Sequence, residues 1–274
     1  MRRGDIGVVV IGLLMAVLLV APLVTLLVRS LRTSDGWSLA NYAGLATTGP
    51  RGAFAVTGWE ALGTSLRKAG LAALLAVSTA LLLSVVLARR PRDPRARRAI
   101  GVLDGLFMLP LGVSAATVGF GLLIALDQPP LDLRTSPWLI PIAQALVAAP
   151  LVVRLILPTL RGIDERLRQA AGMLGASPTK VWLTVDLPLI GPALAGAAAI
   201  AFAVALGEFG ATSFLSRPEN TTLPILIGRL ITRPGPGNAG MAFAAGVVLA
   251  LICGAAVAAV DRFAGRASGF GAMA

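Results

Sequence analysis

The chain has 274 residues, of which 56% are hydrophobic and only 14% are charged, and its net charge is +11. A soluble domain carries about 25% charged residues, so this composition indicates a protein surrounded by lipid rather than water. The chain has no histidine and one cysteine, which excludes an internal disulfide and removes the commonest general base and metal ligand.

The positive charge comes from 22 arginines and two lysines. In a soluble protein such an excess would favour nucleic acid as a partner. In a membrane protein, basic residues usually set the topology instead. We therefore expect the lipid bilayer, and no nucleic acid, as the partner of these charges.

The first predicted element is an apolar run over residues 6–28, which follows Arg2 and Arg3. A cleaved signal peptide is the alternative interpretation. The run is long for a signal core, and no small-x-small cleavage site closely follows it. We therefore predict an uncleaved first membrane span.

Five further stretches are apolar over the roughly 20 residues that a membrane helix requires. They cover about 66–88, 101–126, 137–157, 190–213 and 241–260. With the first run, they predict an all-α, polytopic membrane protein of about six spans, built as a single domain over 1–274. The apolar stretch 222–231 is too short to span and predicts a re-entrant or interfacial piece.

The distribution of lysine and arginine orients these spans. If the N-terminus is cytoplasmic, 15 of the 24 basic residues fall in inside segments, including the densest run, Arg89–Arg98. We read this run as a topology anchor rather than a binding site. The prediction is a multi-pass protein of the bacterial cytoplasmic membrane with both termini in the cytoplasm.

The most informative segment lies on the predicted cytoplasmic side, between spans four and five. Asp164 predicts an N-cap, residues 165–174 a short helix, and Gly175 its C-terminal stop. Ser177 followed by Pro178 predicts the start of a second helix. That helix is expected to run to about Asp186 and to end at Pro188.

The first of these short helices has one small apolar face. Leu167, Ala170, Ala171 and Leu174 recur at the helical spacing that places them on one side. Such a face can fit a groove on a soluble partner, or the helix can lie on the bilayer surface. The small side chains favour the groove, because a bilayer-surface helix usually carries bulky Leu, Phe or Trp.

The same segment resembles the EAA motif of permease subunits in binding-protein-dependent ABC importers. It reads Gln169-Ala170-Ala171, three residues, Gly175-Ala176, and later Leu187-Pro188. The resemblance implies that 164–175 is a coupling helix, which sits in a cleft of an ATP-binding subunit and transmits ATP-driven closure. It implies coupling roles for Leu167, Gln169, Ala170, Ala171, Leu174, Gly175, Ala176 and Pro188. Gln169 departs from the motif's glutamate, which removes a charge and leaves a polar hydrogen bond as the expected contact there.

A wider resemblance extends from about Thr64 to Arg262. The segments that carry it are Leu109–Val113, Ala149–Arg154, Gly207–Ala211 and Arg217–Pro224. They are similar to the ferric-iron and thiamine permease group, in which two six-span halves are often fused. The chain resembles the C-terminal half alone, so a second permease half, identical or different, is implied.

The chain contains no phosphate-binding loop, because neither Lys68 nor Lys180 follows the required glycine spacing. We therefore expect no catalysis, no cofactor and no metal on this chain. The resemblance implies a separate ATP-binding subunit dimer and an extracytoplasmic substrate-binding protein. Transport of ferric iron or thiamine would proceed by alternating access.

Glu208 lies near the outer end of span five, and Phe209 follows it. A carboxylate at membrane depth is costly and often functional, so these two residues are candidates for the translocation pathway. The alternative is structural, with Glu208 pairing a loop arginine or capping a helix.

Two other classes of function are less consistent with the sequence. A stand-alone secondary transporter or channel often shows inverted repeats and several buried charges, and neither is clear in this sequence. A membrane-embedded enzyme would have little to build a site from, since the spans hold no clustered acidic residues.

Overall fold

A computed structural model of the chain describes residues 3–34, 36–49, 54–88, 93–128, 132–233, 235 and 237–270. Arg2 and residues 89–92 of the basic run lie outside the described residues. Contacts group the chain into two compact units. The first comprises Met1–Thr64 and Pro218–Leu251, and the second comprises Ser65–Arg217 and Ile252–Ala274.

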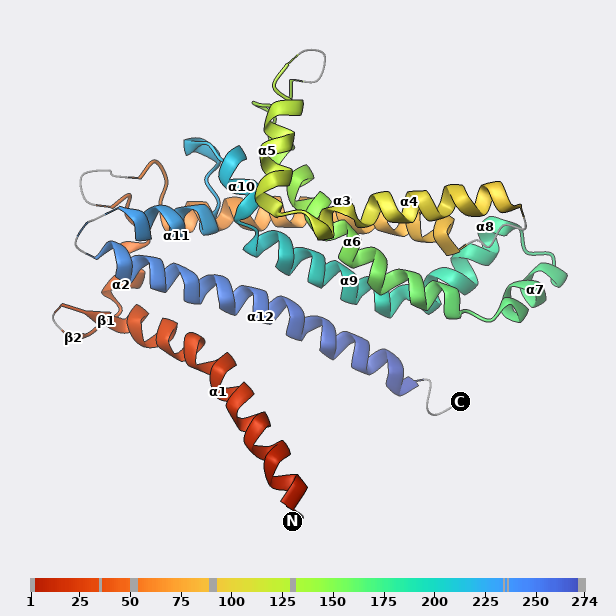
Figure 1. The fold of residues 1–274 in the computed structure, drawn as a ribbon, viewed down its shortest axis with the longest axis horizontal. Coiled ribbons are helices and arrows are strands. Elements are labelled where there is room, and N and C mark those ends of the chain that lie inside the picture. The colour runs from red at the N-terminus through yellow and green to blue at the C-terminus, as the bar shows by residue number, and fades with distance from the viewer. Residues whose placement is uncertain are drawn as a thin grey trace. The chain divides into compact units, whose positions relative to one another are not determined.

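The first unit contains a long helix, a small hairpin and short helices (Figure 1). Its elements are α1 (Arg3–Leu31), β1 (Arg32–Thr33), β2 (Gly36–Trp37), α2 (Ala40–Gly44), η3 (Pro218–Asn220), α11 (Leu223–Thr232) and the first part of α12 (Asn238–Phe270). The two strands are antiparallel, with Arg32 opposite Trp37. The second unit holds most of α3 (Gly58–Ala88), α4 (Pro94–Gly112), α5 (Ala115–Ala125), α6 (Leu139–Gly162), α7 (Glu165–Met173), α8 (Pro178–Val181), η2 (Trp182–Asp186), α9 (Leu187–Gly207), α10 (Gly210–Leu215) and the end of α12.

Several of these helices are long and apolar enough to cross a membrane. By length and composition, five qualify in the described part of the chain, over Val9–Leu31, Gly58–Ala88, Leu139–Gly162, Pro178–Gly207 and Asn238–Ala259. A sixth span is reached if the bent pair α4 and α5 counts as one. The all-α, polytopic fold predicted from the sequence is therefore confirmed.

In the first unit, a buried asparagine anchors the end of α1. The Nδ2 atom of Asn41 donates hydrogen bonds to the carbonyl oxygens of Ser30 (2.8 Å) and Arg32 (3.2 Å), carbonyls that a helix end leaves unpaired.

The stretch predicted as a short apolar piece forms α11. Its buried face, with Leu226 and Leu230, packs in one cluster with Ala242 of α12.

In the second unit, α6 and α9 pack along each other. On α9 the buried residues Ala197, Ala201 and Ala205 recur every four residues and form a smooth stripe. On α6 the buried face includes Ala148 and Val152. Small side chains allow helix backbones to approach closely, which is how helices associate in lipid where no hydrophobic force drives them together.

The stretch predicted as a third span is divided into two helices. The chain bends by 109° between α4 and α5, and Figure 1 shows α5 turned away from the line of α4. Val113 and Ser114 at the bend are extended. Pro110 lies in the last turn of α4 and lacks an N–H, so this turn has one backbone hydrogen bond fewer.

The prediction that the second short helix ends at Pro188 is wrong. The helix continues through Pro188, so that α8, η2 and α9 form one candidate span over Pro178–Gly207. The η2 turn is π-helical, with the Leu187 N–H donating to the Trp182 carbonyl five residues earlier. This wider turn makes room for the proline ring, which a regular α-helical turn would not.

Candidate functional site

The predicted coupling segment forms α7, and both predicted ends are confirmed. Asp164 is the N-cap, and its carboxylate accepts from the Arg166 N–H at 2.9 Å. At the other end Gly175 has a φ of +80°, and the N–H of Ala176 donates to the Ala171 carbonyl at 3.1 Å. With the Gly175 N–H bound to the Gly172 carbonyl at 2.9 Å, this is a Schellman stop, which favours glycine because of its left-handed backbone.

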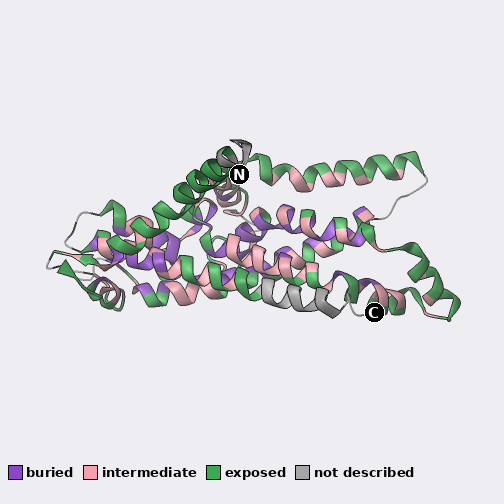
Figure 2. Cartoon of the chain, turned by 90° about the horizontal axis from the view of Figure 1, so that it is seen from below, coloured by how far each residue is buried: buried purple, intermediate pink, exposed green. Residues whose placement is uncertain are grey.

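The described residues leave most of the small apolar face of α7 uncovered. None of the nine residues described over 165–173 is buried, and Figure 2 shows α7, at the right-hand end of the view, mostly in green. Leu167 is 48% exposed and Leu174 89% exposed. Gln169 and Ala170 are also exposed, while Ala171 is half-buried.

Sequence reasoning missed one member of this surface, Met173, which is 84% exposed. It lies beside Leu174 at the tip of the helix, but the helical spacing used for prediction assigned it to no face. Two large apolar side chains at an exposed helix end are a signal that could have found it.

The second short helix begins as predicted. The Ser177 hydroxyl accepts from the Lys180 N–H at 3.4 Å, with Pro178 in the first turn. Because this helix runs on into α9, the segment after the Gly175 turn is the base of a spanning helix rather than a separate piece. Pro188 is exposed in the first turn of α9.

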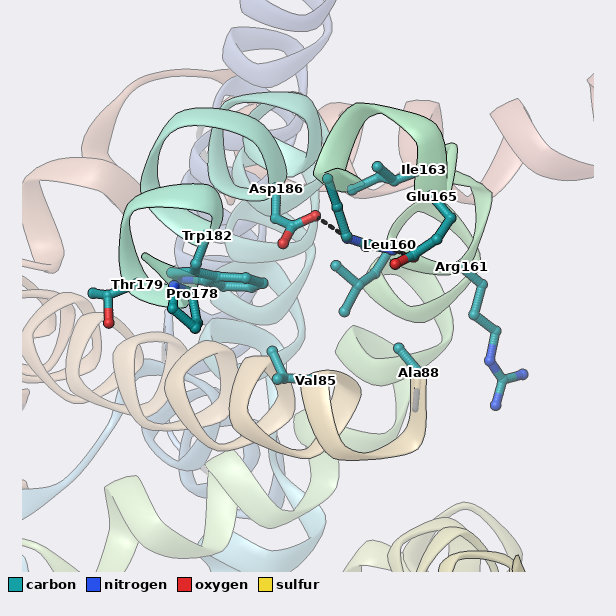
Figure 3. A pocket seen from close by; sticks show the side chains of 11 residues that line it. Val85, Ala88, Leu160, Arg161, Ile163, Glu165, Pro178, Thr179, Trp182 and Asp186 are labelled. Carbon is teal, nitrogen blue, oxygen red and sulfur yellow. Dashed lines mark hydrogen bonds and ion pairs between the residues drawn. The ribbon is translucent and has the colours of Figure 1, made fainter. Parts of the chain in front are cut away.

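A partly buried ion pair joins α7 to that base. Arg168 Nε donates to Asp186 Oδ1 at 2.8 Å, and Arg168 Nη1 donates to Glu165 Oε2 at 2.8 Å (Figure 3). The Asp186 side chain is only 10% exposed, whereas that of Glu165 is 65% exposed. Partial burial lowers the pKa of Arg168, but the two carboxylates outweigh it, and the pKa lies above its usual value.

These side chains line a pocket of about 810 Å³ beside α7 (Figure 3). Its walls come from the ends of α3 and α6, from α7, and from α8 with η2. The lining residues are Val85, Ala88, Leu160, Arg161, Ile163, Glu165, Arg168, Pro178, Thr179, Trp182 and Asp186. Arg161 also ties α6 to α3, because its Nη2 donates to the Leu87 carbonyl at 3.0 Å.

The structure places Glu208 far along the chain from this segment, at a break between α9 and α10. One carboxylate oxygen accepts from the Ala211 N–H at 2.7 Å. The other accepts from the Thr212 N–H at 2.9 Å and from the Thr212 hydroxyl at 2.6 Å. Glu208 is 7% exposed and therefore caps α10, the structural alternative raised by the sequence. Phe209 is 49% exposed, and a pathway role for either residue stays a prediction.

The break at Glu208 meets the break between α4 and α5. A Cβ atom built on Gly210 would lie 3.1 Å from the backbone nitrogen of Ala116, and one built on Gly119 would lie 2.5 Å from Ala211 Cα. The backbones of α5 and α10 are therefore in contact, with glycine at both points of approach. Within the described residues, no group of three or more His, Cys, Asp or Glu side chains could hold a metal ion.

Comparison with known proteins identifies the family. Residues 80–269 match the family described as "Binding-protein-dependent transport system inner membrane component". The molybdenum transport system permease protein ModB of Escherichia coli is 33% identical over 198 residues, which cover 67% of this chain and 84% of ModB. The putative 2-aminoethylphosphonate transport system permease protein PhnV of Salmonella typhimurium is 29% identical over 264 residues, 96% of each chain.

Solved structures agree on the fold. A chain of a bacterial ABC transporter involved in the import of the polysaccharide alginate matches with a TM-score of 0.75 at 17% identity, covering 97% of this chain and 96% of that one. A chain of the MetNI methionine ABC transporter matches with a TM-score of 0.59 at 20% identity, covering 77% and 94%. The chain therefore belongs to the family of binding-protein-dependent transport system inner membrane components, the permease subunits of ABC importers.

Proposed function

We propose that this permease translocates a small oxyanion, either molybdate or a phosphonate, delivered by an extracytoplasmic binding protein. The observation that carries the proposal is the similarity to PhnV along 96% of both chains, supported by the similarity to ModB. Both names refer to substrates with a tetrahedral, negatively charged oxygen group. Ferric iron or thiamine is the second candidate, because the segments Gly207–Ala211 and Arg217–Pro224 resemble that permease group.

The coupling role of α7 belongs to the same proposal. The uncovered side chains of Leu167, Met173 and Leu174 offer an apolar tip that a cleft on an ATP-binding subunit can cover. ATP would bind to that subunit, and two such subunits would serve two permease halves, identical or different. This arrangement requires α7 and both termini to lie in the cytoplasm of a bacterial cell, as the positive charges favour.

Alternating access would then use the helices described above. Closure of the ATP-binding subunits displaces both copies of α7, and each displacement reaches the spanning helix that starts at Pro178. That helix covers about 45 Å at 1.5 Å per residue and ends at the break capped by Glu208. The permease pair opens outward to the loaded binding protein, and hydrolysis returns it to the inward-open state.

Uptake of labelled substrate tests the proposal. Cells lacking this gene are compared with cells carrying it on a plasmid, using molybdate, 2-aminoethylphosphonate, ferric iron and thiamine in parallel. We expect uptake of one oxyanion to be lost and restored, with uptake of ferric iron and thiamine unchanged. Loss of iron or thiamine uptake alone would replace the oxyanion assignment with the second candidate.

A further control separates an importer from a stand-alone transporter or channel. The plasmid-borne permease is expressed with its ATP-binding partner inactivated in the Walker-A lysine. An importer permease loses uptake completely in that strain, while a stand-alone transporter keeps it.

A further inference from the structure

We infer that Arg168 and Asp186 are positioning residues whose ion pair makes α7 and the base of the spanning helix move as one body. The inference rests on the proposed coupling role of α7 and deepens it. It concerns how displacement of an exposed helix reaches the membrane, and it does not depend on which substrate is carried.

The first step is that α7 has little else to hold it. Among its described residues, 165–173, none is buried, and its close neighbours in the fold are α8 and η2. At its ends it is joined to α6 through Ile163 and Asp164 and to α8 through the Gly175 turn. Gly175 is exposed and has no side chain that could pack against α8.

The second step is that an open pocket, rather than packed side chains, lies between part of α7 and its neighbours. A space of about 810 Å³ is bordered by Glu165 and Arg168 of α7 and by Trp182 and Asp186 of η2. Asp186 lines this space, and the dashed line at its carboxylate in Figure 3 marks the hydrogen bond that it accepts from Arg168. Where side chains are packed, a push on one element reaches the next through contacts. Across this space, the ion pair connects Arg168 of α7 directly to Asp186 of η2.

The third step is where Asp186 lies. It is the last residue of the π-helical turn and is buried, directly before α9 begins at Leu187. The carboxylate is therefore fixed to the start of the spanning helix rather than to a flexible loop. Arg168 reaches it with Nε and holds Glu165 with Nη1, a two-sided arrangement that fixes the guanidinium plane.

The two acidic partners of Arg168 differ in exposure and in the element to which they belong. Asp186 is 10% exposed and Glu165 is 65% exposed, so water screens the Glu165 contact much more strongly. Glu165 also lies on α7 itself and cannot link it to another element. We therefore expect Asp186 to matter for coupling and Glu165 to be nearly silent.

The test measures substrate taken up per ATP hydrolysed, in liposomes holding equal amounts of the assembled transporter with its binding protein. We expect Arg168→Ala and Asp186→Ala each to lower this ratio about tenfold, a change equivalent to about 1.4 kcal/mol. Two matched controls on the same helix, Arg166→Ala and Glu165→Gln, should leave it within about twofold. Arg166 makes no ion pair in the described part of the chain. A role confined to folding would lower the amount of assembled complex and leave the ratio unchanged.

A reversible covalent link provides the second readout. Cys253 is the only cysteine, so Cys253→Ala gives a background in which Arg168→Cys and Asp186→Cys can be joined by a short reducible thiol cross-linker. If the two elements move together, cross-linking restores the ratio and reduction abolishes it again. If α7 must instead slide against the spanning helix, cross-linking blocks transport, and this result overturns the inference. An unchanged ratio of substrate to ATP in Arg168→Ala also overturns it.

Failure of the underlying coupling role gives a different pattern. Leu174→Asp places a charge on the exposed tip without touching the ion pair. If α7 docks the ATP-binding subunit, this variant loses copurification of that subunit, whatever the ion pair does. Copurification and uptake that both survive Leu174→Asp refute the docking role itself.

Discussion

The contact between α5 and α10 predicts that replacing one hydrogen atom of Gly119 with a methyl group destabilises the protein. Gly119→Ala places a methyl group 2.5 Å from Ala211 Cα and 2.8 Å from its carbonyl carbon, and closer still to its oxygen. Ordinary van der Waals contact begins at 3.4 Å, so α5 and α10 must separate by about 1 Å. The obstacle is backbone, which cannot rotate out of the way as a side chain can.

The cost follows from the packing that this separation disrupts. Inserting a methyl group into a filled interior costs about 1–3 kcal/mol, and the upper end applies because α10 is also held by the Glu208 cap. For a domain of this size, each kcal/mol lost from the free energy of unfolding lowers the melting temperature by roughly 2–4 °C. A loss of about 3 kcal/mol therefore lowers the melting temperature by roughly 6–12 °C.

The measurement uses the single cysteine. Cys253 is half-buried, so a thiol-reactive dye reports its exposure as the purified, detergent-solubilised protein unfolds on heating. Gly121→Ala is the matched control on the same helix, because no described atom beyond its immediate neighbours in the helix lies within 4 Å of the position of its Cβ. Alanine is the better helix former by up to about 1 kcal/mol, so this control should melt at the same temperature or slightly higher. Equal melting temperatures for the two variants would refute the backbone contact.

Two further predictions concern helix ends. The carboxylate of Glu208 accepts hydrogen bonds from two backbone N–H groups, and Glu208→Gln places an NH₂ donor against one of them. We therefore expect the free energy of unfolding, measured by thermal unfolding, to fall by about 1–3 kcal/mol. A pathway role without a cap predicts lost uptake at unchanged stability instead. Gly175→Val forces a β-branched residue into a left-handed backbone at a cost of about 1–2 kcal/mol, so uptake should fall. The helical control Gly172→Ala should keep uptake, and equal uptake by both variants would contradict the role of the turn.

Much of the local structure of α7 and its ends could be predicted from the neighbouring sequence. A cap such as Asp164 and a stop such as Gly175 act within one or two helical turns, so neighbouring residues contain the information. The apolar spans were also readable, because only long uncharged stretches are stable in lipid. Pro188 was misjudged because the rule that proline ends a helix assumes a regular turn, and the π-helical turn before it removes the steric conflict.

Composition, and residues only a few positions apart, are enough to predict the class of protein, the approximate spans and the local form of α7. Three features could be seen in the folded chain alone: Arg168 pairs with Asp186, Glu208 caps α10 and Gly119 faces Ala211. Those pairings depend on where a π-helical turn and two helix breaks direct the chain in three dimensions. Hydrophobic periodicity carries no signal for such turns, because they alter the direction of the backbone without altering which residues are apolar.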